Sequence, residues 1–148
     1  MAEGTMVPQK LILEILCAIQ GSLGKENQRV FARAGRSLGA EWAATISRAG
    51  SVDELMGKMA AYLQEGLQLA ETVTFEKEGM DYVLKVRRCA ICHGKLVKEK
   101  HGISAACAIS MFPIGALVRN LGIKNARLKE IRKSGPIGDC HLVYEIGR

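Results

Sequence analysis

The sequence predicts an α+β fold in which N-terminal helices pack on an antiparallel sheet. Up to about residue 70, apolar residues recur every three or four positions, which is the period of an amphipathic helix. Later segments alternate apolar and polar residues, which is the period of a strand. These segments come in two pairs, each joined by a short glycine-containing turn, as in antiparallel hairpins. We therefore expect the order α-α-α-β-β-α-β-β.

The first helix is expected in residues 7–24. Pro8 suits the first turn of a helix, and Gly21 and Gly24 offer a stop. Apolar residues at helical spacing form the expected buried stripe between them: Leu11, Ile12, Ile15, Leu16 and Ile19. Residues 1–24 are thus an N-terminal helix that precedes the rest of the domain.

Two further helices are expected in residues 25–50 and 51–70. The first of these contains Gly35 and Gly39. Because glycine costs about 1 kcal/mol in a helix interior, we expect a compensating close approach by another backbone. The second opens with the capping-box pattern S-x-x-E at Ser51, which is typical of a helix start.

The first pair of strands is expected in residues 71–79 and 80–89, where apolar and polar residues alternate. The stretch 89–102 is rich in Lys, His and Gly and is interpreted as a linking segment. A helix follows in residues 104–122, with Pro113 as a kink or break.

The second pair of strands is expected in residues 126–133 and 140–147, joined by the turn 134–139. A chain of 148 residues suits a single domain, and no internal repeat divides it. We therefore treat residues 1–148 as one domain.

Composition and charge narrow the classes of function. The net charge of +6 favours acidic partners. The basic residues are spread along the chain without an aromatic stacking platform, which disfavours nucleic-acid binding. No run approaches the roughly 20 apolar residues of a membrane-spanning helix. The opening MAEGTMVPQK lacks the regions of a secretory signal, so we expect a cytoplasmic protein without a membrane span.

The most unusual stretch is RRCAICHG, residues 87–94, in which a histidine follows a Cys-x-x-Cys pair. Cys17 falls on the apolar stripe of the first helix and is expected to be a buried free thiol. The other four cysteines fall at the boundaries of expected elements: Cys89, Cys92, Cys107 and Cys140. Such positions can converge at one end of a sheet, and four thiolates make a closed structural zinc site. The pattern predicts zinc bound by these four cysteines, with His93 as an alternate ligand.

Other chemistries fit parts of the same pattern. Unlinked structural thiols are common in protein cores. A Cys-x-x-Cys pair can be a redox centre, but that motif belongs in a βαβ unit, which is not expected here. CAICH also has the form of a covalent haem-attachment motif, although an export signal is not recognised. Arg87 and Arg88 are expected at a solvated strand end, where they could also meet an acidic ligand.

Three segments together resemble the 4-vinyl reductase-type domain, a family of small-molecule-binding domains. They are ARAGRSLGAEWA, CAISMFPIGALVRNLGI and the closing ARLKEIRKSGPIGDCHLVYEIGR. The family typically ends with a strand that bears a glutamate, a Gly-Asp turn, a cysteine and an alternating last strand. The matching residues here are Glu130, Gly138, Asp139 and Cys140. The resemblance covers residues 25–148.

The resemblance implies an α/β ligand-binding fold, a small apolar ligand, a homodimer and, in some members, cysteine-bound zinc. Family members often carry another cysteine at the position of Lys133 in this chain. Its absence implies that the remaining zinc ligand would be Cys92 or His93. A binding module is a better inference from this resemblance than an enzyme.

We therefore expect a sensor or carrier of a small hydrophobic ligand, braced by a structural zinc site. One alternative is an accessory enzyme of a reductase or thiol-dependent type, which needs a base beside its cysteine. His141 follows Cys140 in a strand and should point to the opposite face, whereas His93 beside Cys92 remains available. The other alternative is an assembly subunit that meets a protein partner through its surface.

Overall fold

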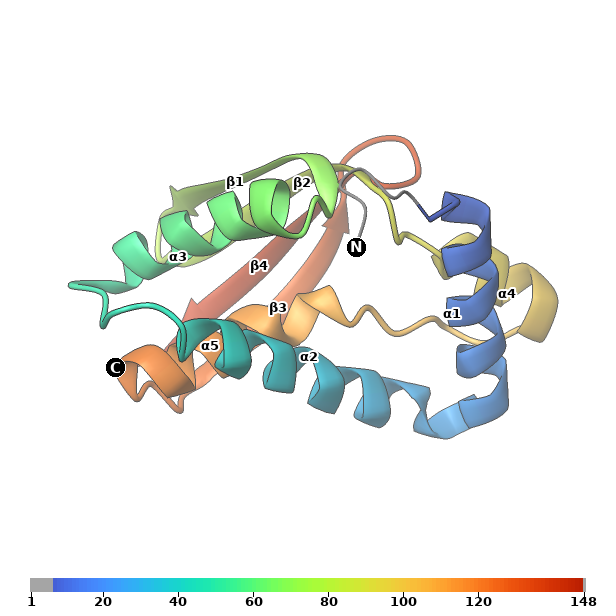
Figure 1. Ribbon diagram of the computed structural model, residues 1–148, viewed down its shortest axis with the longest axis horizontal. Helices are drawn as coiled ribbons and strands as arrows, with labels where there is room; N and C mark the ends of the chain where they lie inside the picture. The colour runs from blue at the N-terminus through green and yellow to red at the C-terminus, as the bar shows by residue number, and fades with distance from the viewer. Residues whose placement is uncertain (1–6, 148) are drawn as a thin grey trace.

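A computed structural model describes residues 7–147 of the chain (Figure 1). Helices precede and cover a four-stranded antiparallel sheet, so the expected α+β class is confirmed. The helices are α1 (Gln9–Leu23), α2 (Asn27–Ala43), α3 (Val52–Ala61), α4 (Gly94–His101) and α5 (Phe112–Leu121). The strands are β1 (Ala70–Glu78), β2 (Asp81–Cys89), β3 (Ala126–Lys133) and β4 (Cys140–Ile146). Short 3-10 turns precede α2 and α5, and a π-helical turn follows α3.

The sheet has the order β1-β2-β4-β3, with both expected hairpins present. The β1–β2 turn is tight, and Gly79 adopts a φ of +63°, a left-handed conformation that favours glycine. β2 and β4 pair in the centre of the sheet, in a register that sets Val83 opposite Val143. The two hairpins thus form one continuous sheet.

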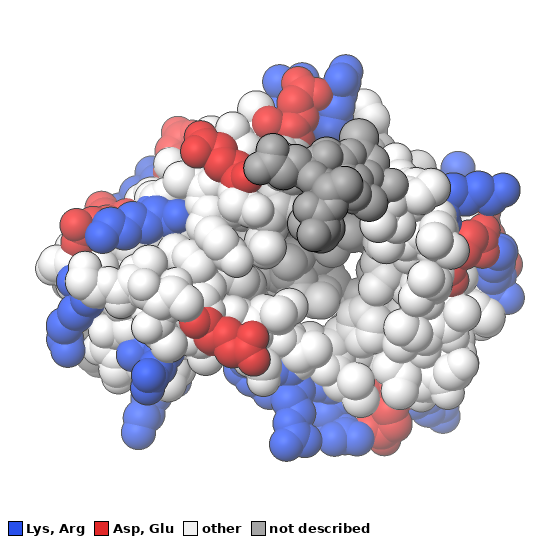
Figure 2. All heavy atoms as spheres, in the orientation of Figure 1, with Lys and Arg blue, Asp and Glu red and all other residues white. Residues whose placement is uncertain are grey.

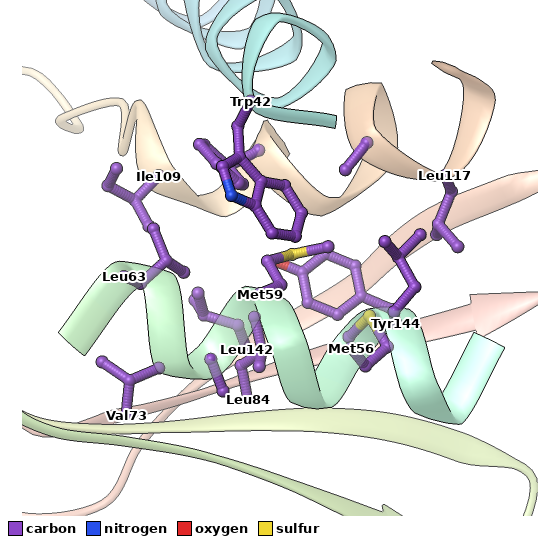
Figure 3. Close-up of a cluster of buried hydrophobic side chains, with 14 of the residues drawn as sticks. Trp42, Met56, Met59, Leu63, Val73, Leu84, Ile109, Leu117, Leu142 and Tyr144 are labelled. Carbon is purple, nitrogen blue, oxygen red and sulfur yellow. The ribbon is translucent and has the colours of Figure 1, made fainter. Parts of the chain in front are cut away.

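One face of the sheet carries the main hydrophobic core. Trp42 of α2 points towards Met59 of α3 and Tyr144 of β4, while Leu84 and Leu142 rise from the central strands (Figure 3). Tyr144 is fully buried, and its hydroxyl donates a hydrogen bond of 2.6 Å to the carbonyl oxygen of Ser110. The core therefore joins α2, α3 and α5 to the central strands.

Helices α2 and α5 meet through their backbones. A Cβ atom on Gly39 would lie 1.9 Å from the carbonyl oxygen of Phe112, and one on Gly35 would lie 2.0 Å from that of Ala108. A Cβ atom on Gly115 of α5 would likewise lie 1.9 Å from the carbonyl oxygen of Arg36. The expected close approach at the glycines of the second helix is confirmed.

The pair α1 and α4 lies at one end of the molecule, beside the sheet and not over it (Figure 1). The stripe expected to be buried on α1 is largely exposed, since Leu11, Ile15 and Ile19 are 51%, 47% and 42% accessible. That expectation was wrong for these three residues, although Ile12 and Leu16 of the same stripe are half-buried. The fully buried residues of α1 are Cys17 and Gln20. Cys17 is only 1% exposed, so its expected burial is confirmed.

Two other expectations need correction. The stretch 89–102 is not merely a link, since it contains α4, held by the fully buried Val97 and ended by Gly102 in a left-handed conformation. The helix expected from residue 104 begins only at Phe112, and Pro113 lies in its first turn and does not kink it. Cys107 consequently lies in a loop before the helix.

No helix in the described range 7–147 is both long and apolar enough to cross a membrane.

Candidate functional site

A cavity of about 240 Å³ lies at the end of the sheet that faces α4. Its wall contains all four of the boundary cysteines: Cys89, Cys92, Cys107 and Cys140. The remaining lining is mainly apolar and includes Ile91, Ile131 and Leu142. Figure 2 shows the surface hollowed between the α1–α4 end and the rest of the molecule, with mostly uncharged atoms around the hollow. The fold thus brings together residues that are up to 51 positions apart, between Cys89 and Cys140.

The turn between β3 and β4 holds two of these cysteines in place. The backbone N–H of Cys89 donates to the carbonyl oxygen of Gly138 at 2.9 Å, and that of Arg88 donates to the carboxylate of Asp139 at 3.0 Å. Gly138 has a φ of +100° and touches the backbone of Cys89, so a side chain would not fit there. The Gly-Asp turn therefore ties the end of β2 to the start of β4 at Cys140.

The loop with Cys107 is held by Gln20, a fully buried residue of α1. Its side-chain Nε2 donates to the carbonyl oxygen of Ala106 at 2.7 Å, and its Oε1 accepts from the backbone N–H of Ala106 at 3.2 Å. Oε1 also accepts from Nδ2 of Asn27, which donates in addition to the carbonyl oxygen of Ser104. One amide side chain thus fixes the loop beside the cavity.

His93 completes this buried network. Its Nε2 lies 2.9 Å from Nε2 of Gln20, which is a donor, so the ring nitrogen accepts. Its Nδ1 lies 2.6 Å from the carbonyl oxygen of Ile91 and must therefore carry the proton and donate. Both nitrogens have partners within the protein, so His93 would have to release Gln20 or Ile91 before it could bind a metal or act as a base.

Three of the cavity thiols, those of Cys89, Cys107 and Cys140, have raised pKa values. Burial raises the pKa of Cys89 to about 12 and outweighs the lowering effect of a hydrogen bond from the backbone N–H of Ile91. Burial likewise raises the pKa of Cys140 to about 11, and the neighbouring Cys107 adds to the increase. Cys107 is accessible through the cavity, yet protein atoms surround its sulfur closely and desolvation raises its pKa as well. At neutral pH these three side chains are neutral thiols.

The ligand types in the cavity favour metal binding, whereas their arrangement does not. Four sulfur ligands suit zinc or another soft metal. However, no three His, Cys, Asp or Glu side chains within residues 7–147 are arranged so that they could hold one metal ion. The thiols therefore share a cavity wall but do not form a ready-made metal site.

His141 lies on the opposite side of the sheet from Cys140. Cys140 borders the cavity, whereas His141 borders a second groove on the other face. This alternation is the expected one, and it removes His141 as a base for the neighbouring thiol.

Gln20 is the residue of the site that sequence reasoning missed. No role was assigned to Gln20 from the sequence, because only the apolar residues and the cysteine of the first helix were considered. One signal was Gly21 beside it within the helix, since a Cβ atom there would meet the side chain of His101 in α4.

No protein-family profile and no curated protein matches this chain. The cavity and its residues therefore carry the functional inference.

Proposed function

We propose that this protein binds a small apolar molecule in the thiol-lined cavity and acts as a sensor or carrier. The single observation that supports the proposal is the cavity itself, which is open to solvent but walled mainly by aliphatic side chains and neutral thiols. Binding of an apolar ligand is favourable here because it removes apolar protein surface from water.

The size of the cavity favours a ligand of few atoms. Its volume of about 240 Å³ falls below the approximate range of 300–1,000 Å³ of sites for drug-sized ligands. Ala105, Ala106 and Ala108 line one side, so the space depends on small side chains there.

A thiol-dependent enzyme is a weaker alternative for two physical reasons. Raised pKa values keep Cys89 and Cys140 protonated, and the thiol is a much poorer nucleophile than the thiolate. His93, the neighbour of Cys92, already uses both ring nitrogens in hydrogen bonds.

Substitution of Ala105 by phenylalanine should fill the cavity and abolish binding of an apolar probe. Benzene is a suitable probe because it occupies apolar cavities as small as about 150 Å³. In the unaltered protein we expect benzene to shift the methyl NMR signals of Ile91, Ile131 and Leu142, whereas the Ala105→Phe protein should show no such shifts.

Ala34→Phe is the matched control, because it adds the same ring at an exposed position of α2. It should leave the benzene-induced shifts unchanged. Equal shifts in the Ala105→Phe protein, or none in the unaltered protein, would contradict binding in this cavity.

Zinc in the same cavity is a second proposal, supported only by the presence of four thiols on one wall. The ion would require these thiols to move together and to lose their protons, which a bound metal promotes. The chemistry that zinc would supply is structural, since four cysteine ligands leave no open position.

Native mass spectrometry tests for zinc directly. A structural site predicts one zinc ion per chain, lost on denaturation, and a smaller share of bound metal in the Cys107→Ser and Cys140→Ser proteins. Cys17→Ser is the control, since this thiol lies outside the cavity and should not change the bound mass. A metal-free mass after purification with added zinc would reject this part of the proposal and leave the apolar cavity intact. A homodimer also stays a prediction, and the same spectra report it.

A further inference from the structure

A second groove, of about 420 Å³, lies on the face of the sheet that the helices leave uncovered. Its polar lining combines three hydroxyl groups with three basic side chains: Thr72, Thr74, Ser134, Lys85, Arg87 and His141. These residues come from three strands and from the turn between β3 and β4. The groove is therefore chemically unlike the apolar cavity on the opposite face.

The register of the sheet sets these groups side by side. Thr74 pairs with Lys85, and Lys85 pairs in turn with His141, so one row of residues crosses three strands. Thr72 pairs with Arg87 in the adjacent row. Because these positions alternate with core residues such as Val86 in β2, their side chains share the outer face.

Part of this positive charge is not neutralised within the protein. Lys85 forms ion pairs with Glu76 at 2.5 Å and with Glu78 at 3.6 Å, so its charge is already compensated within the protein. Arg87, in contrast, forms no ion pair with any residue in the described part of the chain, and its side chain is exposed. Asp139 also lines the groove; its carboxylate accepts a hydrogen bond from the backbone N–H of Arg88 and keeps its negative charge there.

His141 lines the groove and has one ring nitrogen without a hydrogen-bond partner. Its Nδ1 is buried and has no hydrogen-bond partner, and it is the sole side-chain atom of this kind among the described residues. Unpartnered buried polar atoms are rare because each loses its interaction with water without replacement. A half-turn of the ring exchanges Nδ1 with a carbon atom, so the imidazole of His141 can offer a different edge to a ligand in the groove.

We propose that this groove binds a tetrahedral oxyanion of the phosphate class, either free phosphate or a phosphate monoester. Arg87 and Lys85 supply charge-assisted hydrogen bonds, which are the strong interactions with such anions. The hydroxyl groups of Thr72, Thr74 and Ser134 and the ring of His141 supply further donors. Several donors that converge from separate strands suit an anion with four oxygen atoms better than a planar carboxylate.

Two-dimensional NMR with ¹⁵N-labelled protein tests the proposal at constant ionic strength, with chloride replaced stepwise by inorganic phosphate. We expect saturable shifts of the backbone signals of Thr74, Arg87 and His141. A parallel titration with glycerol 2-phosphate distinguishes the two sources, since tighter binding of the ester would indicate a phosphorylated metabolite and tighter binding of phosphate would indicate the free ion.

Arg87→Gln should weaken phosphate binding by about tenfold or more, the factor that corresponds to one lost charge-assisted hydrogen bond. Thr74→Val should weaken phosphate binding by a smaller factor, and valine favours strand structure as threonine does. Arg33→Gln removes the same charge from the exposed surface of α2 and should have no effect beyond a small general change.

Three results would overturn the proposal. They are an absence of saturable shifts, equal weakening by Arg33→Gln and Arg87→Gln, and equally tight binding of acetate. The first excludes a site, the second leaves only a response to net charge, and the third contradicts the assigned class of anion. None of them affects the proposal for the apolar cavity, which lies on the other face of the sheet.

Discussion

Replacement of Gly39 by alanine should lower the free energy of unfolding by about 3 kcal/mol, the upper part of the usual range for overpacking. The added Cβ would lie 1.9 Å from the carbonyl oxygen of Phe112 and 3.1 Å from the backbone nitrogen of Ala116. Neither neighbour is the end of a flexible side chain, so α2 and α5 would have to separate. Urea unfolding followed by the fluorescence of Trp42, the single tryptophan, measures the loss.

Gly57→Ala is the matched control for this experiment. Gly57 also lies inside a helix, α3, but a Cβ there would meet no atom within 4 Å. Alanine should therefore raise the free energy of unfolding by about 0.5–1 kcal/mol, through helix propensity and a less flexible unfolded chain. Equal effects of the two substitutions would show that backbone contact between α2 and α5 is not what requires glycine at residue 39.

The two glycines of α2 show what could be predicted from the sequence. Gly35 and Gly39 were expected to admit another backbone because glycine within a helix has a local cost that calls for compensation. That reasoning needs no knowledge of the partner, which the structure shows to be α5 for Gly39 and the segment just before α5 for Gly35. The strand pairs were predictable for the same reason, since alternation and turn residues are local signals.

The arrangement of α1 and α4 was not predictable in this way. Periodicity locates an apolar stripe but does not say which neighbour will cover it, and Leu11, Ile15 and Ile19 remain exposed in this chain. The helix α4 is short and lacks a strong apolar pattern, since Val97 is its one buried residue. Tertiary contacts with α1 decide its structure.

The candidate site was predictable in part. The boundary cysteines were expected to converge, and all four border one cavity. The four thiols line the cavity but do not form a compact set of metal ligands. That difference depends on side-chain positions, which sequence spacing does not determine. The groove on the opposite face follows from strand register, which pairs Lys85 with His141 only once the hairpins are assembled.

Replacement of Gln20 by leucine should also be strongly destabilising, by about 3 kcal/mol or more, although it puts an apolar residue into a buried position. The change leaves the N–H and the carbonyl oxygen of Ala106 without partners, and likewise Nε2 of His93. Each unsatisfied buried group costs about 1–3 kcal/mol. The loss of free energy is measured by urea unfolding.

A second readout separates loss of the loop anchor from general destabilisation. Under native conditions the amide hydrogen of Ala106 should exchange faster in the Gln20→Leu protein, because Oε1 of Gln20 no longer accepts from it. Amides of the central sheet, such as that of Val143, should change only in proportion to global stability. If the Ala106 amide exchanged no faster than such core amides, Gln20 would not be what fixes the cavity wall.

Gln28→Leu provides the comparison that tests burial as the cause. Gln28 donates to the carbonyl oxygens of Ser104 and Ala105 at 3.3 and 3.1 Å, and so contacts the same loop, but from an exposed position. Water can replace these bonds, so we expect a change within about 0.5 kcal/mol. A large loss for Gln20 beside a small one for Gln28 would show that the loop beside Cys107 depends on a buried amide that water cannot replace. Similar losses would instead make the number of hydrogen bonds, and not their burial, the factor that holds this wall of the cavity.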